Sequence, residues 1–343
     1  MKRKFTRREF LSLAGSGLGS LALNPLLNNL IETETGQVAR IATFSVSVYN
    51  EPWDKSRILY QRYRDELVHL YYEINSPHGP EYNPVWFRVW GGYIHSAHLQ
   101  VVSTRLNPVV SNIPKNGQLA EVTVPYTQSM RMVGKNRWEP LYTLYYESAH
   151  WVVSLDEGPD GEPWYRIKEA WSHLEYHVPA IHLRLVNPAE FTPISPDVPP
   201  EAKHIEISIE RQQLTAFEGD RIVLQTKISS GQHYKPQGAK RWDTPTGDFN
   251  VFSKMPSKHM GDGNLTSDKE AYELPGVPWV CFFHEDGVAT HGTYWHTNYG
   301  TVMSHGCVNM RTAEAKWIFC WTTPVSSPGD WEKKGRGTRV IVA

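Results

Sequence analysis

The chain has 343 residues, a formal net charge of −1 and a hydrophobic content of 40 %. This length allows two or three domains, each with a hydrophobic core of its own. The nearly balanced charge gives no signal for binding nucleic acid or another polyanion, and we expect no such partner.

Residues 1–35 have the features of an export signal. Basic residues crowd the start, and residues 11–23 form an apolar run that is too short for a firm membrane-spanning helix. The TRREFL sequence at residues 6–11 resembles the motif read by the twin-arginine export machinery, with a general secretory signal as the alternative. We expect a protein of the periplasm, the cell wall or the extracellular face of the cytoplasmic membrane. It would touch the membrane only through this segment, if the segment stays uncleaved.

Residues 38–187 contain an internal duplication. The same short runs occur twice in the same order, as LYYE, GP, WFRV and HLQ within residues 70–100 and as LYYE, GP, WYRI and HLR within residues 144–184. Aromatic and β-branched runs between Gly-Pro turns predict one small β-barrel used twice. The first unit, residues 38–110, resembles bacterial SH3-like domains, and residues 115–190 form a second, divergent unit.

Such units often accompany cell-wall enzymes, which leaves two roles open for their aromatic side chains. Trp86, Trp90 and Trp164 would either contact wall polymer or form ordinary barrel core. Prolines at positions 193, 196, 199 and 200 then predict a stiff linker over residues 191–200.

Residues 201–343 return to a strand pattern. Strands are predicted over residues 204–209, over 221–228 after a Glu-Gly-Asp turn, and over 249–253 after the TPTG turn at 244–247. Residues 253–263 have the glycine and polar content of a loop. His259 and Met260 on that loop are candidates for contact with a substrate.

Residues 291–311, HGTYWHTNYGTVMSHGCVNMR, carry the chemistry. A thiol attacks a carbonyl carbon as thiolate, so Cys307 needs an imidazole that takes its proton and later returns it to a leaving amine. Spacing alone leaves His291 and His305 as candidate bases, because residues i and i+2 share a face in an extended segment. Gly306 lets backbone N–H groups approach an oxyanion beside the nucleophile.

Other uses of these residues are less well supported. A zinc site would combine His291, His296, His305 and Cys307, but the first two histidines are five apart rather than the four of HExxH, and no CxxC is present. A papain-like cysteine peptidase is excluded by order, since its cysteine precedes its histidine. We therefore expect no metal and no cofactor.

Cys281 and Cys320 both lie in apolar runs, which predicts that they belong to the hydrophobic core. A disulfide between these two cysteines in an oxidising compartment is the alternative, and it would leave Cys307 free.

The HG pair followed by SHGCVN resembles the signature of the L,D-transpeptidase catalytic domain, the YkuD family. The preceding order of strand, turn, strand and TPTG extends the resemblance over residues 201–343. It implies a mostly β protein in which two SH3-like barrels precede an L,D-transpeptidase-type β-sandwich. It also implies that His291 is the general base and Cys307 the nucleophile. The residues that would support this pair and build the oxyanion hole are Ser304, His305 and Gly306.

The resemblance further implies peptidoglycan stem peptides as the substrate. Many members have arginine where this chain has Asn309, although the asparagine form also occurs. Tyr294 and Trp295 lie between the candidate base and the candidate nucleophile, a position that fits either contact with substrate or ordinary packing. Asn309 and Arg311 are further candidates for substrate contact in the same stretch.

The implied reaction begins when the cysteine attacks the carbonyl of the third stem residue, a diamino acid, and expels terminal D-Ala. An acceptor stem amine then resolves the thioester, which gives a 3→3 cross-link. Resolution by water would make an L,D-carboxypeptidase, and resolution by a protein lysine would make a wall-anchoring enzyme. A wall-binding protein that uses the domain only as a scaffold is the non-catalytic alternative.

Overall fold

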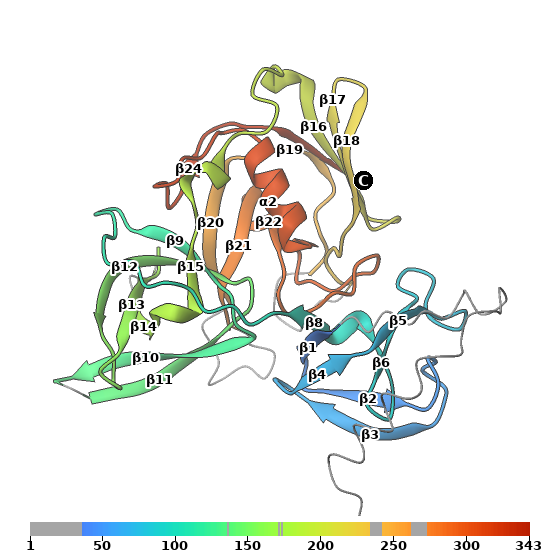
Figure 1. Cartoon of the computed structure of the whole chain (residues 1–343). Coiled ribbons are helices and arrows are strands. Elements are labelled where there is room, and N and C mark those ends of the chain that lie inside the picture. The colour runs from blue at the N-terminus through green and yellow to red at the C-terminus, as the bar shows by residue number, and fades with distance from the viewer. Residues whose placement is uncertain (1–35, 136, 171, 173, 234–241, 262–272) are drawn as a thin grey trace, which may run out of the picture.

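The computed structural model describes residues 36–343 except 136, 171, 173, 234–241 and 262–272. This part of the chain is mostly β, which confirms the predicted fold class, and it contains one α-helix, α2 (Thr312–Trp321). The strands form three successive β regions (Figure 1). The predicted export signal, residues 1–35, lies outside the described residues. No helix within the described ranges is long and apolar enough to span a membrane.

The first β region consists of a five-stranded sheet with the order β3-β2-β7-β6-β5 and a three-stranded sheet with the order β4-β1-β8. Its core contains Trp86, whereas Trp90 is 74 % exposed. The elements are β1 (Gln37–Ile41), β2 (Ser45–Tyr49), β3 (Ile58–Tyr63), β4 (Leu67–Leu70), β5 (Tyr72–Asn75), β6 (Val85–Val89), β7 (Gly92–His95), the 3₁₀ turn η1 (Ser96–His98) and β8 (Leu99–Val102).

The second β region is one seven-stranded sheet with the order β11-β10-β14-β13-β12-β9-β15. Trp164 is buried in it, so Trp90 is the exposed member of the three tryptophans considered from the sequence. Its elements are β9 (Gln118–Val122), β10 (Tyr126–Gly134), β11 (Arg137–Tyr145), β12 (Ala149–Glu157), β13 (Pro163–Lys168), β14 (Glu175–Pro179), the 3₁₀ turn η2 (Ala180–His182) and β15 (Leu183–Leu185). The 3₁₀ turns η3 (Pro188–Phe191) and η4 (Pro200–Ala202) then lead into the third region.

The third β region has two five-stranded sheets, β18-β17-β16-β25-β19 and β23-β22-β21-β20-β24. Side chains of both sheets and of α2 form one hydrophobic core, which includes Ile205, Cys281 and Phe319. Cys281, Cys307 and Cys320 are all free thiols. The strands are β16 (Lys203–Ser208), β17 (Gln213–Glu218), β18 (Arg221–Lys227), β19 (Gly247–Asn250), β20 (Ser253–Gly261), β21 (Glu273–His284), β22 (Val288–Gly292), β23 (Val308–Met310), β24 (Lys333–Lys334) and β25 (Arg339–Val342).

Three sequence predictions for this region were wrong. The strand predicted over residues 249–253 is not continuous, because β19 ends at Asn250 and β20 begins at Ser253. The predicted loop over residues 253–263 is strand β20 as far as Gly261, and its last two residues lie outside the described ranges. Glycine and polar content suggests a loop, but pairing with the long apolar strand β21 holds this segment extended. The Glu-Gly-Asp turn joins β18 to β17, a strand that the sequence analysis did not identify, rather than to β16.

Two buried lysines bind the carbonyl end of α2. Lys254 in β20 is 1 % exposed, and its Nζ donates to the carbonyl oxygens of Phe319, Thr322 and Pro324. Lys203 Nζ donates to Trp321 O at 3.1 Å. Cations at a helix C-terminus satisfy its free carbonyls and oppose its dipole. Lys203 lies in β16 and Lys254 in β20, so these hydrogen bonds connect the helix to both sheets.

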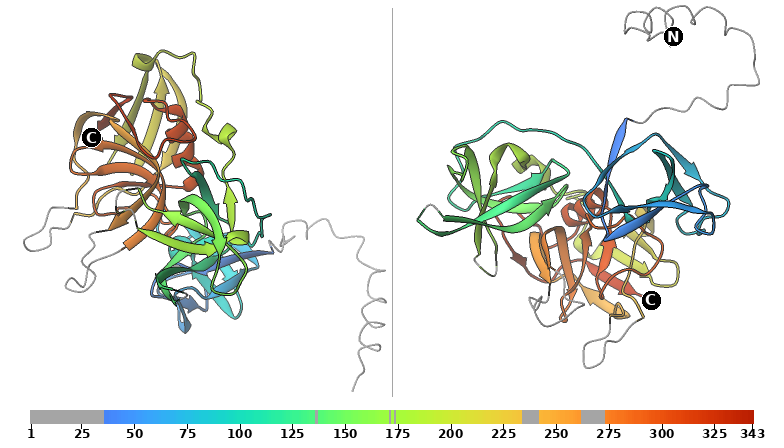
Figure 2. Two further views of the ribbon diagram at one scale, coloured as in Figure 1. Left: turned by 90° about the vertical axis from the view of Figure 1, so that its left-hand side faces the viewer. Right: turned by 90° about the horizontal axis from the view of Figure 1, so that it is seen from below.

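The second β region packs against the β20–β21 hairpin of the third, and both N-terminal regions lie along the same side of the third (Figures 1 and 2). Gly276 in β21 has a φ of +71° and lies against the His150 ring of β12, where a Cβ would come within 2.3 Å of the imidazole. His150 contacts Ser148 Oγ at 2.8 Å and Tyr176 Oη at 3.2 Å. Burial lowers the pKa of His150 to about 3, so the ring is neutral at pH 7.

We predict that Gly276→Ala destabilises the protein by about 2–4 kcal/mol, because the substitution combines a left-handed backbone with an overlap at His150. Gly219→Ala is the matched control, since Gly219 also has a positive φ but nothing lies within 4 Å of its added Cβ. It should cost about 1–2 kcal/mol. Urea unfolding measures the free energy of unfolding of both variants. Equal losses of stability at the two positions would show that the contact with His150 is unimportant.

Candidate active site

Parallel pairing of β22 with β23 places the predicted base and nucleophile on one sheet face. His291 lies opposite Asn309 in the register, and Cys307 immediately precedes β23. Paired residues share a face, as do residues two apart along a strand, so all three side chains project to the same side. The Cα atoms of Cys307 and His291 are one strand apart across the sheet and two residues apart along it. These two displacements together give a separation of about 8 Å. An imidazole and a thiol can meet across that distance.

His291 is held as a neutral imidazole. The side chain is 2 % exposed, and its Nδ1 lies 3.0 Å from the carbonyl oxygen of Gly292. A carbonyl only accepts, so Nδ1 carries the hydrogen and Nε2 keeps a lone pair. Burial lowers the pKa of His291 to about 4. The residue is therefore in the protonation state and tautomer that a general base requires.

Cys307 is half-buried and protonated in this structure. Burial raises the pKa of its thiol to about 11, against an opposing contact with the Ala289 backbone. The Sγ–H donates to Gly287 O at 3.8 Å, and within the described residues no hydrogen bond joins it to His291. The sulfur has to turn from this carbonyl toward the imidazole before it can lose its proton.

The turn before Cys307 is fixed by two hydroxyl groups. Ser304 Oγ accepts from Gly306 N–H at 3.1 Å and donates to the carbonyl of Cys307. Thr244 Oγ1 donates to Gly306 O at 2.7 Å and accepts from Gly231 N–H. In the sequence, Thr244 is recognisable only as part of the predicted TPTG turn. Its hydroxyl sets the position of the residue before the nucleophile.

His305 does not share a face with the nucleophile in an extended strand, contrary to the sequence-based geometry. Gly306 has a φ of +121°, a conformation that favours glycine, and it turns the chain between them. His305 is exposed, and its ring packs edge-on against Trp242 at 3.9 Å between centroids. Of the two candidate bases, His291 is the one on the strand that pairs beside Cys307.

The remaining substrate-contact candidates lie in different surroundings. Trp295 packs with Cys307 in one apolar cluster and lies 5.8 Å from the His291 ring. Tyr294 is 2 % exposed, and its hydroxyl donates to Pro275 O at 2.9 Å. Asn309 is also buried, and its amide lies 2.8 Å from His296 Nε2. Arg311 is at the surface over the Tyr299 ring. Of these four candidates, Trp295 is the one that packs against the same apolar cluster as Cys307.

The two candidates on β20 lie beside the second β region. His259 Nδ1 is 2.6 Å from Glu169 Oε1. Met260 joins the apolar cluster that includes Trp295 and Cys307, as does Ala170. The second region therefore contributes to the surroundings of the nucleophile.

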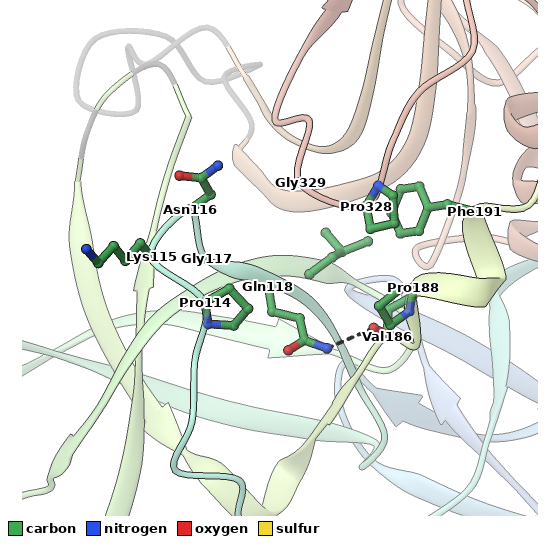
Figure 3. Close-up of a pocket in the computed structure, with 11 residues that line it drawn as sticks. Pro114, Lys115, Asn116, Gly117, Gln118, Val186, Pro188, Phe191, Pro328 and Gly329 are labelled. Carbon is green, nitrogen blue, oxygen red and sulfur yellow. Dashed lines mark hydrogen bonds between the residues drawn. The ribbon is translucent and has the colours of Figure 1, made fainter.

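The four residues of the alternative zinc site are not gathered around one point. His296 is paired with Asn309 and His305 with Trp242. Among the described residues, no group of three His, Cys, Asp or Glu side chains is arranged to hold a metal ion. A pocket of about 360 Å³ elsewhere, shown in Figure 3, contains none of the candidate site residues. It is lined by residues 114–119, Val186, Pro188, Phe191, Pro328 and Gly329.

Residues 202–342 match the family model YkuD, the L,D-transpeptidase catalytic domain. This YkuD domain contains every residue of the candidate site. Among solved structures, this chain is similar to an L,D-transpeptidase of Xylanimonas cellulosilytica, with 28 % identity, a TM-score of 0.31, and coverage of 41 % of this chain and 60 % of the other. An Enterococcus faecium L,D-transpeptidase has 26 % identity, a TM-score of 0.31, and coverage of 41 % and 50 %.

An L,D-transpeptidase of Mycobacterium smegmatis matches over more of this chain, with 72 % coverage of this chain and 92 % of the other, at 17 % identity and a TM-score of 0.32. The chain spans about half to three-fifths of the lengths of the Enterococcus and Xylanimonas chains. No curated protein matches the chain. The assignment of the YkuD domain rests on the family model.

We predict that alkylation of Cys307 by iodoacetamide accelerates about tenfold per pH unit between pH 7 and 10, because a thiol with a pKa of about 11 is only about one part in 10⁴ thiolate at pH 7. Mass spectrometry of tryptic peptides measures the rate at each pH, with the fully buried Cys281 as an unreactive internal control. A rate that levels off below pH 8 would instead indicate a thiolate stabilised by His291.

Proposed function

We propose that this protein is a peptidoglycan L,D-transpeptidase that forms 3→3 cross-links by cysteine acyl transfer. The observation that carries the proposal is the pairing of β22 with β23, which presents a neutral, correctly tautomerised His291 and a half-buried Cys307 on one face. The match of residues 202–342 to the L,D-transpeptidase catalytic domain supports the substrate class.

In the proposed first half-reaction, Nε2 of His291 takes the Cys307 proton as the sulfur attacks the carbonyl carbon of the third stem residue. The tetrahedral intermediate collapses, the C–N bond to D-Ala breaks, and the imidazolium returns the proton to the leaving amine. The raised thiol pKa and lowered imidazole pKa both favour the neutral pair in the resting protein. Proton transfer therefore accompanies attack on bound substrate.

In the second half-reaction, the side-chain amine of an acceptor stem attacks the thioester and loses its proton to His291. The C–S bond breaks, and the thiol is restored with that proton. Apolar surroundings of Cys307, including Trp295, limit access of water to the thioester. This environment favours an amine acceptor over hydrolysis.

For the oxyanion, we propose the backbone N–H of Cys307 as the nearest donor. The N–H of Gly306 is engaged by Ser304 Oγ, so Gly306 acts through its backbone conformation. Ser304 and His305 then support the turn rather than touch the reacting atoms. His259, Met260, Asn309 and Arg311 remain candidates for the wider substrate contacts.

We propose that residues 1–35 direct export through the twin-arginine machinery and that the YkuD domain acts in the cell wall or periplasm. Residues 38–110 and 115–190 would be two SH3-like units, joined to the catalytic domain, residues 201–343, by the proline-rich linker at 191–200. The exposed Trp90 makes the first unit the better candidate for contact with wall polymer.

We predict that Cys307→Ala abolishes both the covalent adduct formed with a carbapenem and the release of D-Ala from a tetrapeptide stem. His291→Ala should slow adduct formation by about 10²- to 10⁴-fold, because a general base is lost. Cys320→Ala is the control, because the Cys320 thiol donates a hydrogen bond to Glu190 O and lies outside the site. Intact-mass spectrometry follows the adduct. An adduct on Cys320, or a dead His305→Ala with an active His291→Ala, would contradict these roles.

The products of the same assay identify the acceptor. Cross-linked dimers joined through two third-position residues support transpeptidation, free tripeptide indicates an L,D-carboxypeptidase, and tripeptide attached to protein indicates anchoring. Sacculus binding that survives Cys307→Ala, with no D-Ala released by the native protein, would support the non-catalytic alternative.

A further inference from the structure

The chain between the base and the nucleophile is held by the first β region. Thr297 N–H donates to Ala97 O at 3.1 Å, and Thr297 Oγ1 donates to Ser96 O at 2.7 Å. Asn83 Nδ2 donates to Asn298 Oδ1 at 3.1 Å. Residues more than 190 positions apart in sequence thus form one hydrogen-bonded junction between η1 and the segment that follows His291. Figure 1 shows β1 and β8 on the side of the first region that faces the third.

Arg40 of β1 is at the centre of this junction. The side chain is 1 % exposed, and its Nη2 donates to Tyr294 O at 2.9 Å. Nη1 is 2.9 Å from Asp65 Oδ1, and both Nε and Nη2 donate to Gln100 Oε1. The guanidinium carbon lies 3.9 Å from the centroid of the Tyr145 ring of β11. One buried cation therefore contacts all three β regions.

The hydrogen-bond network around Arg40 also includes residues of the second β region. Asp65 Oδ2 accepts from Tyr145 Oη at 3.3 Å, and Gln100 Nε2 donates to Tyr146 O at 2.7 Å. Both partners of Arg40 in the first region are thus bonded to the second. A buried guanidinium is stable only when its donors are matched in this way, and its planar fork fixes the directions of its partners.

The position of Tyr294 is transmitted to the site by direct packing. The Tyr294 and Trp295 rings meet edge to face at 4.9 Å, and Trp295 lies 5.8 Å from the His291 ring. Trp295 also shares its apolar cluster with Cys307. Movement of the Tyr294 backbone would move the Trp295 ring, which lies beside His291 and packs against the same apolar cluster as Cys307.

We infer that Arg40 is a positioning residue for the Cys307–His291 pair, acting by anchoring Tyr294 and thereby Trp295. The first β region is then part of the catalytic unit rather than only a spacer or a wall-binding module. The activity readout of this inference rests on the proposed function, whereas the anchoring itself does not.

The test compares Arg40→Met with wild type in two measurements made well below the unfolding temperature of each protein. Hydrogen exchange of residues 294–298 should accelerate at least about tenfold in the variant, because the Tyr294 carbonyl loses its donor. Carbapenem acylation of Cys307 should slow about 10- to 100-fold in its maximal rate, because small displacements of reacting groups cost this much. Arg40→Lys, which keeps the charge and one donor direction, should restore part of the rate.

Arg62→Met is the matched control. Arg62 is a guanidinium of the same β region, but it is partly exposed and pairs with Glu66 four residues away. Exchange at residues 294–298 and acylation should both stay within about twofold of wild type. If Arg40→Met does not fold, Thr297→Val supplies the test, since it removes the Oγ1 bonds to Ser96 and Leu99 and keeps the backbone bond to Ala97.

The possible results separate the inference from the proposed function. A folded Arg40→Met protein with wild-type exchange and wild-type acylation overturns the positioning role of Arg40 and leaves the proposed function intact. The same result for Thr297→Val overturns the wider claim that the first β region is part of the catalytic unit. Faster hydrogen exchange of residues 294–298 with an unchanged rate of Cys307 acylation also overturns the positioning role of Arg40. A wild-type protein that forms no adduct and releases no D-Ala removes the proposed function, and exchange in the variants still decides whether Arg40 anchors the segment.

Discussion

The site depends on the parallel pairing of β22 with β23. Parallel neighbours cannot be joined by a tight turn, so the chain must leave the sheet after Gly292 and return before Val308. A crossover of this kind usually contains a helix, but here residues 293–307 contain none. Without internal backbone pairing, this crossover has to be ordered by contacts from outside. Those contacts come from backbone hydrogen bonds to residues 228–232, from the first β region and from the buried pair His296–Asn309.

The burial that orders this crossover also determines protonation. His291 is covered by Trp295 and by its own strand neighbours, so the imidazolium is poorly solvated and the neutral ring is favoured. The same surroundings disfavour the thiolate of Cys307. The neutral imidazole of His291 and the protonated thiol of Cys307 are therefore both consequences of packing.

Buried cations recur where separate elements of the fold meet. Arg40 joins the three β regions, while Lys203 and Lys254 bind the carbonyl end of α2. Each satisfies backbone carbonyls that secondary structure leaves without a partner. Replacing such a cation exposes several acceptors to an apolar interior at once. Junctions built in this way are specific because few other arrangements match all of the donors.

The sequence by itself determined the class of fold, and it predicted the residues of the candidate site. Alternating strands and Gly-Pro turns are local patterns, and they were sufficient to predict that the chain is mostly β. The spacing of His291 and Cys307, together with the SHGC run, was sufficient to predict a candidate base and a candidate nucleophile. The predicted loop at β20 and the strand β17 show where local patterns fail, since pairing with distant strands decided both.

Tertiary structure decided which neighbours make those residues competent. Nothing in the run around Arg40 signals that it reaches the Tyr294 carbonyl, and nothing around Thr244 signals its bond to Gly306. These contacts join parts of the chain far apart in sequence, so no periodicity records them. Placement of His305 outside the sheet likewise follows from the left-handed backbone of Gly306. Local sequence predicts the candidate reacting groups, and long-range packing sets their orientation and protonation, because both depend on atoms that only the folded chain brings near.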